Sequence, residues 1–237
     1  MQEVLALIEQ KKQEYAQLSL FNFMQNKNIN PRQRLVWAPC AAHFIMNFAE
    51  LNKYFLRVEP TSDPIQALIN AHTYEDDHHW LWFLEDLKSL ELDKSLKFSD
   101  ALKFLWSEET KSARWLNYQL YRYASQATPI QKIIVIQVTE ATGNVMFSRA
   151  AEIGKEIKAI SKKPCRYFAC LHLDVEIGHM TGTPGIEEIL QQIQLSEVVQ
   201  QELFELVENL FTAFTQFTND LLVYAETHQI EQRLKVA

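Results

Sequence analysis

Apolar and charged residues are interspersed along most of the chain, and start and stop signals divide this pattern into helical segments. The N-terminal segment, residues 1–12, is typical of an amphipathic helix that carries charges throughout. The segments predicted as helices are residues 1–24, 31–56, 64–90, 99–127, 129–162, 165–180, 184–194 and 197–228.

Two of these helices begin with clear capping signals. Asp63 stands directly before Pro64, and Thr128 stands directly before Pro129. An Asp or Thr cap followed by Pro at the first helical position is a common helix start. One apolar run, residues 133–136, is also compatible with a strand and is the main exception to a purely helical pattern.

The composition favours the same fold. Of 237 residues only 5 are Gly and 7 are Pro, and 47% are hydrophobic. Few helix breakers among many helix formers predict an all-α protein, a multi-helix bundle. No repeat, low-complexity segment or linker divides the chain, so we expect one domain over residues 1–237.

Charge and cysteine content exclude several classes of protein. The formal net charge is −7 and basic residues form no patch, so we expect no nucleic-acid partner and no membrane partner. The apolar runs are too short to span a bilayer, and the N-terminal segment does not resemble a signal peptide. The 3 cysteines include no CxxC motif and are expected as buried thiols in a reducing cytoplasm.

The strongest chemical signal is a triplet near residue 175. His172, Glu176 and His179 are spaced i, i+4 and i+7, which places them on one face of a helix. Their immediate neighbours are apolar, so this face is expected to be buried. Imidazole and carboxylate are the usual ligands of iron, zinc or manganese, although a hydrogen-bonded His/Glu network explains the same spacing.

Two further segments contain candidate ligands. Glu140 lies in a very apolar helix, where a carboxylate needs a cation or an ion-pair partner. Residues 72–80 hold three histidines and three acidic residues, with His72, Glu75 or Asp76, and His79 on one helical face. A solvated charged turn is the simpler interpretation of that segment alone. The three segments together predict a metal site, because five of the 7 histidines lie in them.

The arrangement resembles the heme-oxygenase-like di-iron oxidases and oxygenases. Their pattern is Glu, six residues, then His on one helix, a lone Glu on a later helix, and His, three residues, Asp or Glu, two residues, His on a third. The resemblance covers the central two thirds of the chain. The matching residues are His79 for the first His, Glu140 for the lone Glu, and His172, Glu176 and His179 for the last triplet.

The chain departs from this pattern at one position. Where the family has the first Glu, this sequence has His72. Three interpretations follow: His72 ligates in its place, Glu75 or Asp76 turns inward, or the second metal position is weak or lost. The departure therefore affects the number of metal ions more than the presence of a metal.

The resemblance implies a function as well as a fold. It implies a heme-oxygenase-like bundle, related to thiaminase-2 and pyrroloquinoline-quinone-synthesis proteins, that holds one or two iron ions or other divalent metals. The expected activity is oxidation of an unknown small organic substrate by dioxygen. A homodimer is expected by association with the fold.

Four alternatives stay open at this stage. A metal-free enzyme of the same fold would use the His and Glu residues as acid–base groups. A non-catalytic binding protein would carry a degenerate metal site. A heme oxygenase proper would need His43 as the proximal ligand. A ferritin-like di-iron bundle would use Glu75 with His78, and Glu176 with His179, together with single carboxylates.

Overall fold

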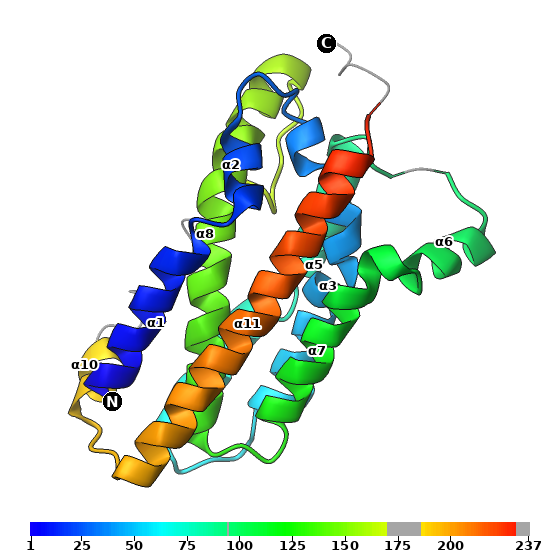
Figure 1. Ribbon diagram of the computed structural model, residues 1–237. Helices are drawn as coiled ribbons and strands as arrows, with labels where there is room; N and C mark the ends of the chain where they lie inside the picture. Colours follow the sequence, from blue (N-terminus) through cyan, green and yellow to red (C-terminus); the bar gives the residue numbers. More distant parts are fainter. Residues whose placement is uncertain (94, 170–185, 231–237) are drawn as a thin grey trace.

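The computed structural model describes residues 1–93, 95–169 and 186–230, and every regular element in these ranges is helical (Figure 1). The predicted all-α bundle is therefore confirmed for this part of the chain, and residues 133–136 belong to a helix. The α-helices are α1 (Gln2–Tyr15), α2 (Ser19–Gln25), α3 (Ala42–Leu51), α4 (Pro64–Asp76), α5 (Trp80–Ser89), α6 (Phe98–Leu105), α7 (Lys111–Ala124), α8 (Pro129–Ser161), α10 (Ile186–Gln192) and α11 (Glu197–Thr227). Short 3₁₀ turns occur at Gln33–Leu35, Ala38–Ala41 and Glu108–Thr110, and a π-helical turn at Asn52–Leu56.

Two long helices, α8 and α11, form the frame of the bundle. α8 has 33 residues, which corresponds to a length of about 50 Å. It begins after Thr128, as the sequence predicted, with a capping box in which Thr128 and Gln131 satisfy each other's backbone N–H groups. α11 packs against α8, α7 and α1, and α1 also packs against α8 (Figure 1). The core lies between these helices and α3.

Several helices are shorter than the sequence pattern predicts. The predicted helix 1–24 is interrupted at residues 16–18, and 64–90 is interrupted at residues 77–79. The segment 31–56 consists of two 3₁₀ turns, α3 and the π-helical turn, because Pro39 has no backbone N–H for a continuous α-helical hydrogen-bond ladder. Residue 165 is irregular and residues 166–169 form bends and turns, so the helix predicted to start at residue 165 is wrong there.

One helix, α6 (Phe98–Leu105), lies at the periphery of the bundle. α6 projects away from the bundle (Figure 1), and none of its residues is buried. Among the described helices, none combines the length and apolar character that crossing a membrane requires.

Candidate metal centre

The site begins on α4, whose start is set by a side-chain cap. The Asp63 carboxylate accepts hydrogen bonds from the backbone N–H groups of Ile65 and Gln66, at 2.8 and 2.9 Å. Pro64 follows at the first helical position, where its missing N–H is not needed. The helix then carries His72 and Asp76 on one face, four residues apart.

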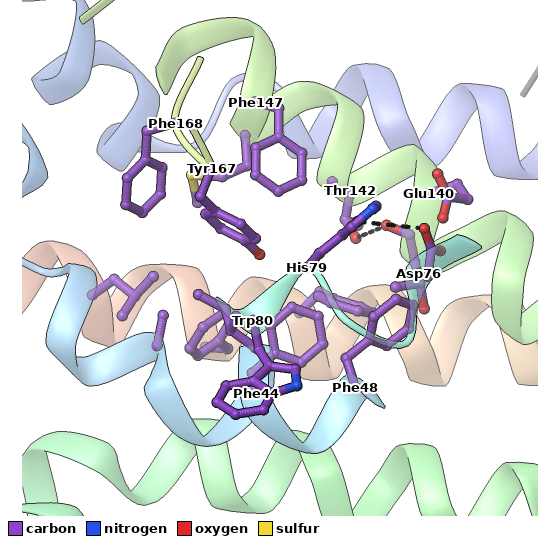
Figure 2. A pocket seen from close by; sticks show the side chains of 18 of the residues that line it. Phe44, Phe48, Asp76, His79, Trp80, Glu140, Thr142, Phe147, Tyr167 and Phe168 are labelled. Atoms are coloured by element: carbon purple, nitrogen blue, oxygen red, sulfur yellow. Dashed lines mark hydrogen bonds and ion pairs between the residues drawn. The ribbon is translucent and has the colours of Figure 1, made fainter. Parts of the chain in front are cut away.

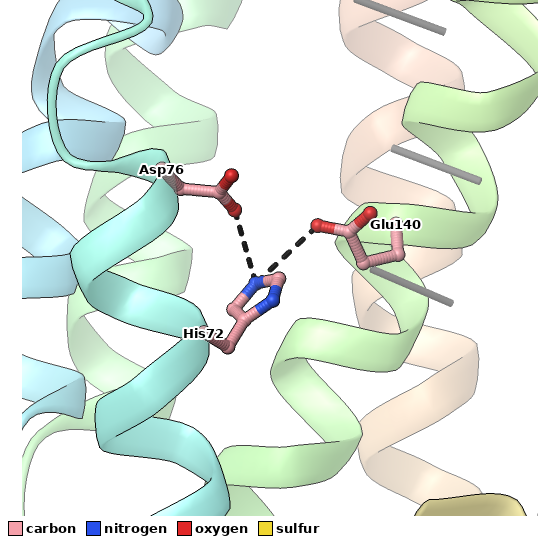
Figure 3. A group of neighbouring side chains, drawn as sticks. All are labelled: His72, Asp76 and Glu140. Carbon is pink, nitrogen blue, oxygen red and sulfur yellow. Dashed lines mark ion pairs between the residues drawn. The ribbon is translucent and has the colours of Figure 1, made fainter. Parts of the chain in front are cut away.

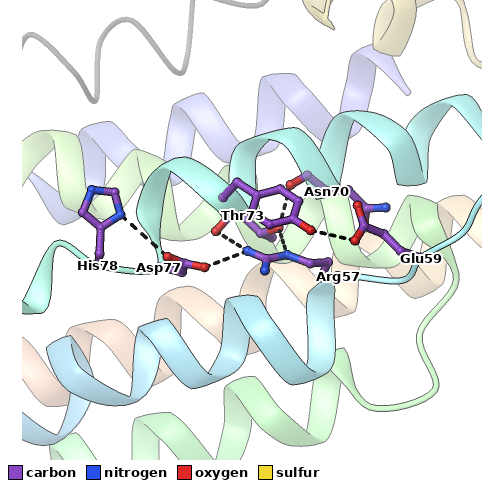
Figure 4. A network of polar contacts seen from close by, with 7 residues as sticks. Arg57, Glu59, Asn70, Thr73, Asp77 and His78 are labelled. Atoms are coloured by element: carbon purple, nitrogen blue, oxygen red, sulfur yellow. Dashed lines mark hydrogen bonds and ion pairs between the residues drawn. The ribbon is translucent and has the colours of Figure 1, made fainter.

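The end of α4 is fixed by Arg57 (Figure 4). Its guanidinium donates to the backbone carbonyl of Thr73 at 2.9 Å and to the Asp77 carboxylate at 2.9 Å. It also lies 3.6 Å from the centre of the Tyr74 ring, and the Tyr74 hydroxyl donates to Glu59. A cation at the C-terminal end of a helix stabilises carbonyls that have no partner within the helix. Arg57 therefore holds the turn at which the chain leaves α4.

Three side chains from two helices converge beside this turn (Figure 3). His72 and Asp76 come from α4, and Glu140 comes from α8. The Nε2 atom of His72 lies 3.0 Å from Asp76 Oδ2 and 3.4 Å from Glu140 Oε1. The side chains of Asp76 and Glu140 are only 1% and 5% exposed, so both carboxylates are removed from solvent.

The spacing of these ligand atoms fits a metal ion. One atom from each of the three side chains lies within 4.8 Å of the others. Two ligand atoms about 2.1 Å from one ion, at angles of about 90–110°, are about 3.0–3.4 Å apart. A hydrogen bond explains one such distance equally well. However, His72 Nε2 carries at most one hydrogen and faces two carboxylates, so it can donate to only one of them at a time. A single cation can bind the imidazole and both carboxylates together.

His79 lies next to this group. Its Nδ1 atom is 3.5 Å from Asp76 Oδ1, its side chain is 9% exposed, and its ring stacks on Trp82 with 4.4 Å between ring centres. The neighbouring His78 is instead 52% exposed and faces Asp77 at 3.6 Å. The turn between α4 and α5 thus directs His79, rather than His78, toward the buried carboxylates.

The structure brings together some of the predicted ligands and not others. His72, His79 and Glu140 lie close together, as the sequence pattern predicted, whereas Glu75 is exposed and Asp76 occupies the buried position. The ferritin-like alternative needs Glu75 and His78 to point inward, and both are exposed. The remaining predicted ligands lie outside the described residues: His172, Glu176 and His179.

His43 is engaged elsewhere, which removes the support for a heme-oxygenase proper. Its Nε2 atom lies 2.5 Å from the backbone carbonyl of Leu105, and its ring contacts Trp106 edge-on. A carbonyl only accepts hydrogen bonds, so Nε2 carries the hydrogen there and offers no lone pair to iron.

An apolar cavity of about 80 Å³ adjoins the cluster (Figure 2). Its polar wall includes Asp76, His79 and Glu140, together with Thr139 and Thr142. The rest of the wall consists mainly of aromatic side chains from α3, α8, α11 and the segment after α8, chiefly Phe44, Phe48, Phe147, Tyr167, Phe168 and Phe214. A ligand in this cavity would therefore contact the cluster at one end and apolar rings elsewhere.

One wall of the cavity is anchored by Asp86 on α5. Its carboxylate accepts the backbone N–H groups of Arg166 at 2.6 Å and Phe168 at 2.8 Å. Burial raises the pKa of Asp86 to about 6, and these backbone hydrogen bonds oppose the rise. On α8, Gly154 faces the same segment: a Cβ atom there would lie 2.1 Å from the Phe168 carbonyl, so the close approach requires glycine.

Asp76 is the residue that the sequence interpretation underweighted. The signal was its i+4 spacing from His72, which is shorter than the spacing of the family pattern.

A comparison with protein-family models finds no match to this chain, and a comparison with curated proteins finds no match either.

Proposed function

We propose that this protein is a non-heme iron protein of the heme-oxygenase-like type that uses dioxygen to oxidise a small organic substrate. The observation that carries the proposal is the position of His72 Nε2, within 3.4 Å of two buried carboxylates from different helices and beside an aromatic cavity. Imidazole and carboxylate form a donor set that suits iron and manganese as well as zinc.

Each described residue has a role in this proposal. His72, Asp76 and Glu140 hold the ion, and His79 adds a fourth donor or orients Asp76. Bound ferrous iron would supply the electrons that dioxygen reduction needs. The aromatic walls exclude water from the side of the ligands that faces the cavity. The resemblance assigns His172, Glu176 and His179 to the same centre, which leaves room for a second ion.

The test is the iron-to-protein ratio after anaerobic loading with ferrous iron. The wild type is expected to bind at least one ion, and the variants His72→Ala and Glu140→Ala are expected to lose at least about 100-fold in affinity. Dioxygen is then admitted, and its consumption is followed with an electrode. Absence of stoichiometric iron uptake by the wild type would overturn the proposal.

The turn after α4 supplies matched controls. His78→Ala and Glu75→Ala remove exposed neighbours of His79 and Asp76, so they are expected to load iron like the wild type. Equal losses in the exposed and the buried variants would mean that the described cluster is not the binding site. His172→Ala tests the part of the centre that the resemblance adds.

A metal-free acid–base enzyme is the second candidate. It is favoured by the 3.0 Å distance between His72 Nε2 and Asp76, which suits a carboxylate-oriented general base. In that case the loading experiment gives no stoichiometric metal, and His72→Ala abolishes substrate turnover in the presence of a chelator.

A further inference from the structure

The cavity beside the cluster is too small for a large ligand as it stands. Apolar cavities of roughly 150 Å³ bind benzene or xenon and stay free of water. The cavity here measures about 80 Å³ and has mostly aromatic and aliphatic walls. It therefore suits a small apolar molecule, such as a diatomic gas, better than an aromatic ring.

Tyr15 separates this cavity from a groove on the protein surface. The same side chain lines the cavity and a groove of about 370 Å³ between α1 and α11. It is 4% exposed, and its hydroxyl shares a 2.6 Å hydrogen bond with Thr218 Oγ1 on α11. Its ring also packs edge-on against Phe21 and Phe211, with ring centres 5.3 and 6.3 Å away.

Tyr15 stands at the end of a helix. It is the last residue of α1, and the helical path is interrupted at residues 16–18 before α2 begins. On the solvent side, the groove is spanned by the partly exposed ion pair of Lys11 and Glu208, at 2.9 Å. Exposed ion pairs of this kind contribute little to stability. The hydrogen bond to Thr218 is thus the main polar contact that holds the ring in place.

We propose that the cavity is a binding site for dioxygen and other small apolar gases, and that Tyr15 is the gate through which they enter from the α1–α11 groove. The inference rests on the proposed function for the use made of dioxygen. The cavity and the gate are tested on metal-free protein, so the two claims fail separately.

Trp37 provides the measurement. It lines the cavity and is 2% exposed, whereas the other four tryptophans are half-buried or exposed. Room-temperature phosphorescence comes from rigid, buried indoles and is quenched when dioxygen reaches them. The quenching rate constant in metal-free protein therefore reports the arrival of dioxygen in the cavity.

The variants Tyr15→Phe and Thr218→Val each remove the hydrogen bond from one side. Both are expected to raise the quenching rate constant between about twofold and tenfold, the factor that corresponds to one net hydrogen bond. Thr218→Ser keeps a hydroxyl and is expected to behave like the wild type. Tyr121→Phe removes the hydroxyl that donates to Asn47 on α3, away from the cavity, and serves as the matched control.

Two results would overturn the inference. One is an unchanged quenching rate constant in Tyr15→Phe and Thr218→Val. The other is an equal increase in Tyr121→Phe, which would indicate general loosening of the bundle. A crystal pressurised with xenon tests the site itself: xenon is expected in the cavity, and xenon bound only elsewhere would contradict the proposal. Iron loading, measured on separate wild-type samples, decides the proposed function independently.

Discussion

Two of the regions that bury charged side chains balance the charge differently. Near α2, Arg34 is 2% exposed, donates to the Met24 carbonyl at 3.0 Å and forms an ion pair with Glu156 of α8. In the cluster, Asp76 and Glu140 are similarly buried, and the groups near their carboxylates include the imidazoles of His72 and His79.

The difference lies in the source of the opposite charge. Arginine remains charged at all relevant pH values, so the Arg34 region is neutralised by the chain itself. Imidazole is charged only when protonated, and it can also act as a neutral ligand. The first region is therefore expected to stabilise the fold, and the second to depend on what binds to it.

The largest expected effect is the contrast between Arg34→Met and Glu140→Gln in metal-free protein. Arg34→Met removes a buried guanidinium, its hydrogen bond to the Met24 carbonyl and its ion pair with the partly exposed Glu156, and is expected to lower the free energy of unfolding by about 3 kcal/mol. Glu140→Gln removes a buried negative charge and is expected to change it by less than about 1 kcal/mol. Urea unfolding in chelator measures both, and equal losses would remove the distinction between the regions.

Asp86 is a third buried carboxylate, and its partners are backbone N–H groups. Its raised pKa means that the folded protein takes up this proton at a higher pH than the unfolded chain does. Its contribution to stability should therefore grow as the pH falls from about 7 to about 4, and be lost as the pH rises through about 6. At about 1.4 kcal/mol per pKa unit, the change amounts to up to about 3 kcal/mol.

Asp86→Asn provides the comparison for this effect. The free energy of unfolding is measured for both proteins across the pH range, and the wild-type minus variant difference is expected to increase on acidification. A difference that stays constant with pH would show that Asp86 does not titrate in the folded protein.

Metal binding should raise the free energy of unfolding only where the cluster is intact. At an iron concentration of about 100 times Kd, anaerobic iron is expected to raise the free energy of unfolding by about 2.7 kcal/mol. Asp76→Asn should lose this gain, and Glu75→Gln, one residue away and exposed, should keep it. A gain that persists in Asp76→Asn would place the bound ion elsewhere.

The smallest expected effect concerns an uncharged position in the same region. Gly143 lines the cavity one turn after Glu140, and a Cβ there would make ordinary contact with Phe147 at 3.6 Å. Gly143→Ala is expected to raise the free energy of unfolding by up to about 1 kcal/mol through helix propensity. It should also shrink the cavity. A destabilised variant in thermal unfolding would mean that the ring of Phe147 cannot yield there.

Helical content and most helix starts were predictable, because caps such as Asp63 and Thr128 act through neighbouring residues. The interruption at residues 77–79 was not predictable, because it depends on Arg57, which is about 20 residues earlier in the chain. In the candidate site too, features set by nearby residues were predictable and features set by packing were not. The sequence pattern identified His72, His79 and Glu140, but the choice of Asp76 over Glu75 depends on how α4 packs on α8.

The path of α5 links two parts of the molecule mechanically. The helix is preceded directly by His79 and carries Asp86 two turns later, where the carboxylate binds the backbone of residues 166 and 168. A rigid helix transmits displacement along its length. Any shift of His79 when an ion binds should therefore be carried to Tyr167 and Phe168, so that ligation and the shape of the cavity change together.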